Sequence, residues 1–128
     1  MIEAFDPCGA AGQAGDAAAI ERLAGEGASP DAKGERGTPA VVMAADRGHA
    51  GAVSALVRLG ADLDARDSSG GETALMMAAW GQVECARALL AGGADRTLRA
   101  TGGRCKGKTA LQIAEWEGKA EVAALLRE

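Results

Sequence analysis

Residues 102–109 of the chain, Gly-Gly-Arg-Cys-Lys-Gly-Lys-Thr, match the spacing of a phosphate-binding loop. In the pattern Gly-x-x-x-x-Gly-Lys-Ser/Thr, backbone N–H groups and the lysine hold the phosphates of a nucleotide. This chemistry needs a buried strand before the loop and a long helix after it, within an α/β sheet. Neither is indicated here, and Gly107-Lys108-Thr109 belongs to a Gly-x-Thr element that recurs along the chain. Nucleotide binding is therefore not predicted.

Nucleophilic and metal chemistry have no better support. His49 is the single histidine, so a Ser-His-Asp or Cys-His arrangement would have to use it. No Gly-x-Ser-x-Gly element is present to place a serine nucleophile. The 3 cysteines, Cys8, Cys85 and Cys105, show neither Cys-x-x-Cys spacing nor a disulfide framework. We expect no catalytic residue, no metal and no cofactor, and thus no enzyme.

Composition favours a small helical protein. The 128 residues predict a single domain, 1–128. Hydrophobic residues make up 48% of the chain but aromatic residues only 2%, so a core built on large rings is not expected. Small apolar residues suit close contacts between helices. The net charge of −4 argues against general nucleic-acid binding.

Cysteine usage and the termini indicate the compartment. An odd number of unpaired cysteines is typical of a reducing environment. The N-terminus lacks the basic and then apolar pattern of a signal peptide. No apolar run approaches the roughly 18 residues that a membrane span needs. We expect a monomer in the cytoplasm, with the nucleus as the alternative.

A fixed period runs along the chain. Gly27-Ala28, Gly60-Ala61 and Gly93-Ala94 lie 33 residues apart. Another glycine lies 12 residues before each pair, and a fourth follows Gly81 after 37 residues; these are Gly15, Gly48, Gly81 and Gly118. Self-similarity at such a period predicts a solenoid of stacked repeats.

The pattern predicts that each unit forms two helices followed by a loop. Thr38-Pro39, Thr73-Ala74 and Thr109-Ala110 are expected to open the first helix with threonine as N-cap, and Asp6-Pro7 to do so in the first unit. The inner glycine then breaks that alanine-rich helix. A second helix carries larger apolar residues at spacings of 3 and 4, and the Gly-Ala pair ends it.

These elements together resemble the ankyrin repeat family. The resemblance is carried by "GTPAVVMAADRGH", "ETALMMAAWGQ" and "KTALQIAEWEG", followed by "LVRLGAD" and "LLAGGAD". It implies an all-α ankyrin-repeat solenoid of four repeats at about 1–32, 33–65, 66–98 and 99–128. The first matches weakly and the last has polar positions, so both are expected to act as caps. His49 falls at the family's Gly-His position, which implies a structural role.

The resemblance also implies a function, because ankyrin repeats usually bind proteins. In the family, the residues before the inner glycine and before the capping threonine face the concave side. Tryptophan there is a candidate for a dominant contact. The alternative is that Trp80 and Trp116 pack on each other or on a loop, with Trp116 covering the end of the stack. The implied positions are Asp46, Arg47, Glu72, Trp80, Lys108, Trp116 and Glu117.

One loop is longer than its counterpart. Asp95 to Thr109 spans 14 positions, against 11 from Asp62 to Thr73. The extra residues lie in a segment without acids, which carries Arg96, Arg99, Arg104, Lys106 and Lys108. A basic finger beside exposed tryptophans would suit a partner protein with an acidic surface. The alternatives are a solvated, flexible insertion kept extended by its like charges, a surface for RNA or another polyanion, and self-association.

The cysteines are interpreted from their positions. Cys85 falls at a core position of a predicted outer helix and is expected to be inert, and Cys8 falls at an apolar position where a helix is expected to start. Cys105 is expected to be exposed in the basic loop, where neighbouring cations would lower the pKa of its thiol and allow a redox or modification role.

Overall fold

The computed structural model describes residues 15–27, 29–31, 33, 37–68 and 70–128. Asp6-Pro7 and Cys8 lie outside this part of the chain. Within it the protein has 7 helices and no strand beyond two isolated bridges, which confirms the all-α expectation. The helices are α2 (Ala17–Gly25), α3 (Ala40–Asp46), α4 (Ala50–Arg58), α5 (Ala74–Ala78), α6 (Val83–Ala91), α7 (Ala110–Trp116) and α8 (Ala120–Arg127).

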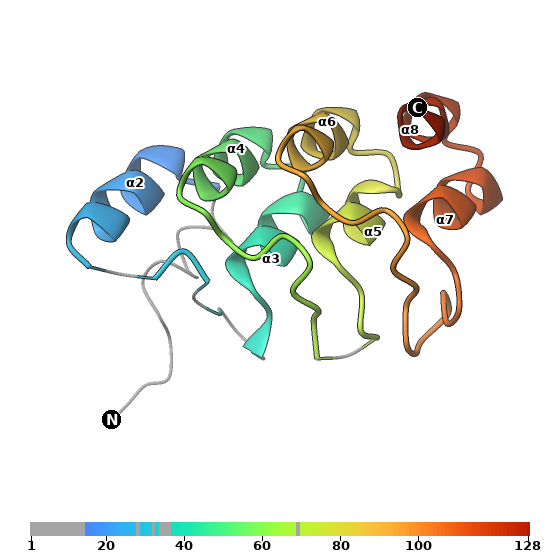
Figure 1. Cartoon of the computed structure of the whole chain (residues 1–128), viewed down its shortest axis with the longest axis horizontal. Helices are drawn as coiled ribbons and strands as arrows, with labels where there is room; N and C mark the ends of the chain where they lie inside the picture. Colours follow the sequence, from blue (N-terminus) through green and yellow to red (C-terminus); the bar gives the residue numbers. More distant parts are fainter. Residues whose placement is uncertain (1–14, 28, 32, 34–36, 69) are drawn as a thin grey trace.

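The helices form two layers. Figure 1 shows α2, α4, α6 and α8 in one row and α3, α5 and α7 in the other, while the connecting loops extend from one side of the stack. Helix α3 packs on α5 and α5 on α7, and α4 and α6 follow the same order in the other row. Each repeat therefore contacts chiefly its neighbours, as in a solenoid.

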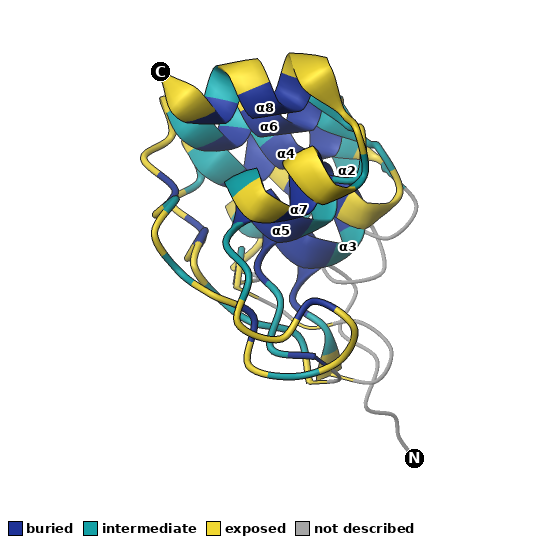
Figure 2. Ribbon diagram, turned by 90° about the vertical axis from the view of Figure 1, so that its right-hand side faces the viewer, coloured by how far each residue is buried: buried dark blue, intermediate teal, exposed yellow. Residues whose placement is uncertain are grey.

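The core lies between the two layers (Figure 2). The inner row contributes alanines, which let these short helices approach closely, together with larger side chains such as Leu75, Met76 and Ile113. The outer row contributes larger apolar side chains at the predicted spacing. The fully or nearly fully buried members of the outer row include Ile20, Val53, Leu56, Leu89, Val122 and Leu126.

Threonine caps two of the inner helices as predicted. The hydroxyl of Thr73 accepts a hydrogen bond from the backbone N–H of Met76 at 3.4 Å. Thr109 accepts from the N–H of Gln112 at 3.3 Å, and the Gln112 side chain accepts from the N–H of Thr109 at 2.9 Å. This reciprocal pair satisfies two N–H groups that the helix itself leaves without partners.

The predicted cap at Thr38 is wrong. Pro39 takes the N-cap position of α3, and no side chain caps that helix. The sequence has one extra residue between Thr38 and Ala44, and the later start absorbs it, so α3 keeps 7 residues like α7. The residue missing from the next repeat is absorbed instead by α5, which has only 5 residues.

The inner glycines Gly15, Gly48 and Gly81 each lie against a side chain of the next repeat. Gly15 and Gly48 both have φ of 77°, in the left-handed region that disfavours a Cβ atom. A Cβ on Gly15 would lie 2.5 Å from Cγ of His49, and one on Gly48 would lie 2.7 Å from Oε1 of Gln82. His49 therefore has a packing role, as its position predicted.

A second set of contacts joins the repeats on the loop side. The carboxylate of Asp31 accepts a hydrogen bond from the N–H of Asp62 at 2.6 Å. One repeat further along, Asp64 accepts from the N–H of Asp95 at 2.9 Å. Backbone groups that would otherwise depend on water are thus satisfied across the junctions.

Substituting two glycines separates backbone strain from steric contact. Gly60 and Gly71 have φ of 83° and 63°, but a Cβ on Gly60 meets nothing within 4 Å, whereas one on Gly71 would collide with Thr101. We expect Gly60→Ala to lower the free energy of unfolding by about 1 kcal/mol, and Gly71→Ala by about 2–4 kcal/mol because strain and overpacking combine. Urea denaturation followed by circular dichroism measures both. Equal losses would contradict the close contact at Gly71.

Candidate functional site

The two tryptophans lie at the ends of neighbouring inner helices. Each is 7 residues after its capping threonine, Thr73 or Thr109. Trp116 is the last residue of α7, whereas Trp80 follows the shortened α5 by two positions. The side chain of Trp116 is 51% exposed, as predicted, but Trp80 is only partly exposed.

Arg104 joins the two rings. Its guanidinium carbon lies 5.6 Å from the ring centroid of Trp80 and 5.8 Å from that of Trp116. Nζ of Lys108 lies 4.6 Å from the Trp116 centroid. At these distances a cation is attracted to the electron-rich faces of the rings. The inserted loop therefore folds onto the tryptophans and forms one contiguous surface with them, here named the Trp80–Arg104–Trp116 cluster.

The inserted loop is compact, so the expectation of a finger extended by like charges is wrong. The N–H of Gly107 donates to the carbonyl of Ala100 at 2.8 Å, and the N–H of Ala100 donates to the carbonyl of Lys108 at 3.0 Å. The N–H groups of Thr101 and Gly102 both donate to the carbonyl of Gly70 in the preceding loop, at 3.2 and 3.0 Å. These backbone bonds close the loop and attach it to its neighbour.

Two of the five cations of the segment stabilise the fold. Arg99 donates to the carbonyl of Gly107 at 2.8 Å and to the side-chain oxygen of Gln112 at 3.3 Å. Arg96 donates to the carbonyl of Leu126 at 2.9 Å, next to the end of α8. The other three cations have no carboxylate partner within 4.0 Å among the residues the structure describes; they are Arg104, Lys106 and Lys108.

The remaining predicted residues flank the cluster. Asp46 and Arg47 are exposed at the end of α3, one repeat before Trp80. Glu117 is the partly buried C-cap of α7. Glu72 is partly buried directly before Thr73, so it lies beneath the inserted loop rather than at the open surface.

Cys105 corrects the prediction of an exposed, reactive thiol. It is 2% exposed, and its thiol lies beside the Glu72 carboxyl group. Burial and the negative charge of Glu72 raise the pKa of Cys105, and the positive charges of Arg104 and Lys108 offset this only in part. The thiol thus anchors the loop. Cys85 is buried in α6 as predicted, and burial likewise raises the pKa of its thiol.

The phosphate-loop spacing has no matching structure around it. Among the described residues no strand precedes Gly102; Ala100 forms only an isolated bridge with Lys106. Thr109 caps a helix of 7 residues. The Gly-Lys-Thr triplet therefore serves the repeat, in agreement with the sequence interpretation.

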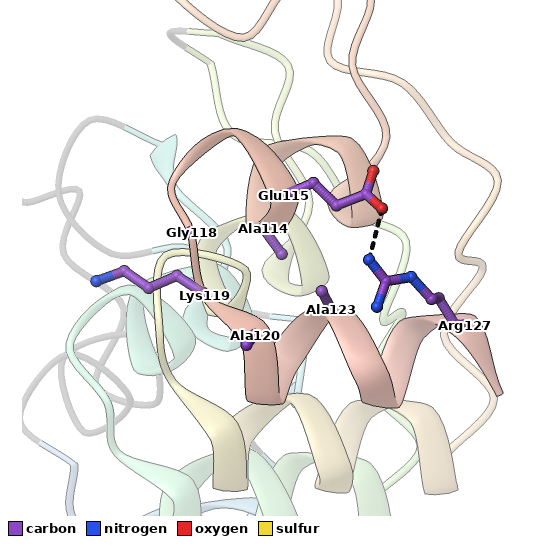
Figure 3. A pocket seen from close by; sticks show the side chains of 7 residues that line it. All are labelled: Ala114, Glu115, Gly118, Lys119, Ala120, Ala123 and Arg127. Atoms are coloured by element: carbon purple, nitrogen blue, oxygen red, sulfur yellow. Dashed lines mark hydrogen bonds and ion pairs between the residues drawn. The ribbon is translucent and has the colours of Figure 1, made fainter.

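Hollows open beside α7 on two sides. One of about 590 Å³ lies beside the cluster and is lined by Lys106, Gly107, Lys108, Gln112, Glu115 and Trp116. The other, of about 330 Å³, lies between α7 and α8 (Figure 3). An ion pair of 2.8 Å between Arg127 and Glu115 spans this second hollow. The counterpart of Glu115 in the preceding repeat is Ala79, which is buried. The last repeat therefore has charged side chains at a position that is apolar in the repeat before it.

Comparison with known proteins identifies the family. A family model for ankyrin repeats, in 3 copies, matches residues 8–100. The chain belongs to the ankyrin repeat family. No curated protein matches it. Helices α7 and α8 lie beyond the matched residues but are separated by a glycine with positive φ like the preceding pairs, and Thr109 caps α7 as Thr73 caps α5. The boundaries of the four repeats remain a prediction.

Membership of this family carries a general function. Ankyrin repeats are generally protein–protein interaction modules without enzymatic activity. Within the described part of the chain, no three or more potential ligands gather to hold a metal ion, and no helix is long and apolar enough to cross a membrane.

Sequence reasoning missed the contacts that build the site. It placed the tryptophans and the cations near each other but gave Arg104 no special position. It also missed the pairing of Glu72 with Cys105. The alternating small and polar residues of 101–107 carry no repeat pattern, so the sequence contains no signal for the path of the loop.

The anchored thiol should react slowly. Because Cys105 is buried and its pKa is raised, we expect iodoacetamide at pH 7.5 to label it at least about 10-fold more slowly in the native protein than in urea. Peptide mass spectrometry measures the rate at each cysteine, and buried Cys85 serves as the internal comparison. Native labelling of Cys105 as fast as in urea would contradict the anchored position.

Glu72 should make stability depend on pH. Burial, followed by the nearby Asp67 charge, raises its pKa above the ordinary 4.5 in the folded protein. The protonated Glu72 therefore stabilises the folded protein fully at a pH below the ordinary pKa of the carboxyl group. This stabilisation is lost as the pH rises through the higher pKa of the folded state. We expect Glu72→Gln to gain stability relative to the wild type between pH 4 and pH 7.

Urea denaturation at both pH values measures this difference. The control is Glu121→Gln, which removes one negative charge from an exposed position on α8. A Glu72→Gln effect that is the same at both pH values would show that ionisation of Glu72 does not oppose folding.

Proposed function

We propose that the chain binds a partner protein through the ends of α3, α5 and α7 and the loops before α5 and α7, with the Trp80–Arg104–Trp116 cluster at the centre. The observation that carries the proposal is the position of Arg104 within 6 Å of both ring centroids. It unites the basic loop and the aromatic side chains in one surface. The family's general role in protein–protein interaction supports the same conclusion.

The chemistry of the cluster favours a partner with an acidic surface and an apolar anchor. Tryptophan and arginine are enriched among the residues that dominate binding energy at protein interfaces. The exposed half of Trp116 supplies apolar area, and three cations without carboxylate partners supply positive potential. Acidic groups on the partner would steer association and fix its orientation.

The contributions of the flanking residues differ. Arg99 supports the loop from beneath through its bonds to Gly107 and Gln112, and Glu72 holds the Cys105 anchor. Both belong to the site as positioning residues. Exposed Asp46 and Arg47 extend the surface toward the preceding repeat and offer charges of both signs at its edge.

A nucleic acid is a weaker fit for the same surface. Basic side chains beside aromatic rings can bind single strands, but acids at Asp46, Glu115 and Glu117 flank the cations. The protein as a whole carries a charge of −4. The salt dependence of binding separates these possibilities, because contacts with many phosphates give a steep slope.

The first test compares capture of partners from a cell lysate. We expect the variant carrying Trp80→Ala and Trp116→Ala to lose a protein that the wild type enriches, through a loss of about 2 kcal/mol or more in binding free energy. Mass spectrometry identifies the captured protein, and titration with the purified partner gives the loss. Circular dichroism checks that the double variant stays folded.

The control variant is Arg87→Ala, which removes an exposed side chain from α6 in the outer row. It should capture the same proteins as the wild type. Equal capture by a folded tryptophan double variant would remove this surface from consideration, and nuclease-sensitive recovery of nucleic acid would favour the alternative.

A further inference from the structure

The hollow beside the cluster offers an unusual set of polar groups. Its volume is about 590 Å³, and Trp116 forms its aromatic wall. Lys106 and Lys108 both line it, on either side of Gly107, and Nζ of Lys108 lies 4.6 Å from the Trp116 centroid. Neither lysine has a carboxylate within 4.0 Å among the described residues. Two positively charged residues without carboxylate partners therefore border one hollow.

The third polar side chain in the lining also presents donors. The side-chain oxygen of Gln112 already accepts from the N–H of Thr109 at 2.9 Å and from Arg99 at 3.3 Å. An amide group has one acceptor oxygen and one NH₂ with two donors. Since the oxygen is occupied, what Gln112 can still offer a ligand is its two N–H groups.

The single acid in the lining is already paired. A carboxylate oxygen of Glu115 lies 2.8 Å from Nη2 of Arg127, and Figure 3 shows the two side chains meeting on the α8 side of α7. Its charge is thus offset by a cation that points toward it from the other helix. The free hydrogen-bonding capacity of the hollow is therefore nearly all donor capacity.

Arg104 adds to the positive potential next to this space. Its guanidinium carbon lies within 6 Å of both indole centroids, and Arg104 forms no ion pair with the described part of the chain. A planar guanidinium stacked on a ring keeps its N–H donors at its edge, where they can meet an oxyanion.

We propose that this hollow binds the phosphate group of a phosphorylated serine or threonine on the partner, a conclusion that rests on the proposed function. A phosphate monoester carries a charge of about −1.5 to −2 and three acceptor oxygens at pH 7. It matches two ammonium groups and the donors of Gln112. A single carboxylate would leave one ammonium uncompensated. The wall formed by Trp116 covers the carbon atoms that carry the phosphate.

The test titrates a small probe into ¹⁵N-labelled full-length protein. The probe is N-acetyl-O-phosphoserine methylamide, and the comparison compound is N-acetylglutamate methylamide, both at constant ionic strength. We expect saturable shifts of the Trp116 indole N–H and of the 106–112 amides, with a Kd on the order of 1 mM. The carboxylate compound should bind at least about 5-fold more weakly, since it carries one charge.

Variants locate the site. The double variant with Lys106→Gln and Lys108→Gln should raise the Kd of the phosphate probe by about 10-fold or more, because two charge-assisted hydrogen bonds are lost. Arg87→Gln with Lys119→Gln removes the same number of charges from α6 and from the N-cap position of α8, and should leave the Kd unchanged. Lowering the pH from 7 to 5 should also raise the Kd of the phosphate probe. The second ionisation of the phosphate has a pKa of about 6, so the probe carries less negative charge at pH 5.

Contrary results are equally specific. Equal Kd values for the two compounds would overturn the phosphate assignment, as would shifts spread over all surface lysines or an unchanged Kd in the lysine double variant. The outcome is separate from that of the lysate experiment. If partner capture still depends on the tryptophans while the phosphate probe fails, the proposed function stands and this inference falls.

Discussion

Three repeats reverse direction at a glycine whose φ angle is positive and whose bare Cα lies against a side chain of the following repeat; these glycines are Gly15, Gly48 and Gly81. Two requirements meet at that atom. The backbone needs a conformation that other residues adopt only with strain, and the neighbour needs the volume of the missing methyl group. The distance between repeats is therefore fixed where the inner helices end. Trp80 directly precedes Gly81, so the same constraint acts next to Trp80. Trp116 lies two residues before Gly118, which shares the positive φ angle but has no side chain against it.

Much of this architecture follows from the sequence because the residues that recur with the period are those whose backbone conformation or hydrogen bonding the fold requires. Glycines with positive φ and threonines that cap helices recur with the repeat, and each has a local physical cause. The start of α3 was mispredicted because the choice between Thr38 and Pro39 depends on how one extra residue is absorbed, which is settled by packing. Local propensity alone does not decide such a case.

The site was less predictable than the fold. The positions of Trp80 and Trp116 follow from the period, but Arg104 belongs to an insertion without a counterpart in the other repeats. Cys105 was misjudged because its neighbours in sequence are cations, whereas its neighbours in space include the Glu72 carboxyl group. A small apolar thiol gains from burial, and the glycines around it let the chain turn it inward.

The charge of the inserted loop is divided between structure and surface. Arg96 and Arg99 are held by backbone carbonyls, whereas Arg104 and Lys108 lie over aromatic rings. A count of basic residues therefore overstates the charge open to a partner. What is left is localised, and it lies beside an aromatic wall, which suits recognition of one group better than diffuse attraction to a polyanion.

The closure of the loop by Ala100 with Gly107 and Lys108 has a consequence for how such a protein can diversify. The chain leaves the stack and returns to it at a hydrogen-bonded pair of positions. Between them, Thr101 and Gly102 bind the preceding loop and Cys105 is buried, so the loop is anchored at these positions. The outward positions 104 and 106 can then accept different side chains, and new specificities can arise, without altering the contacts that hold neighbouring repeats together.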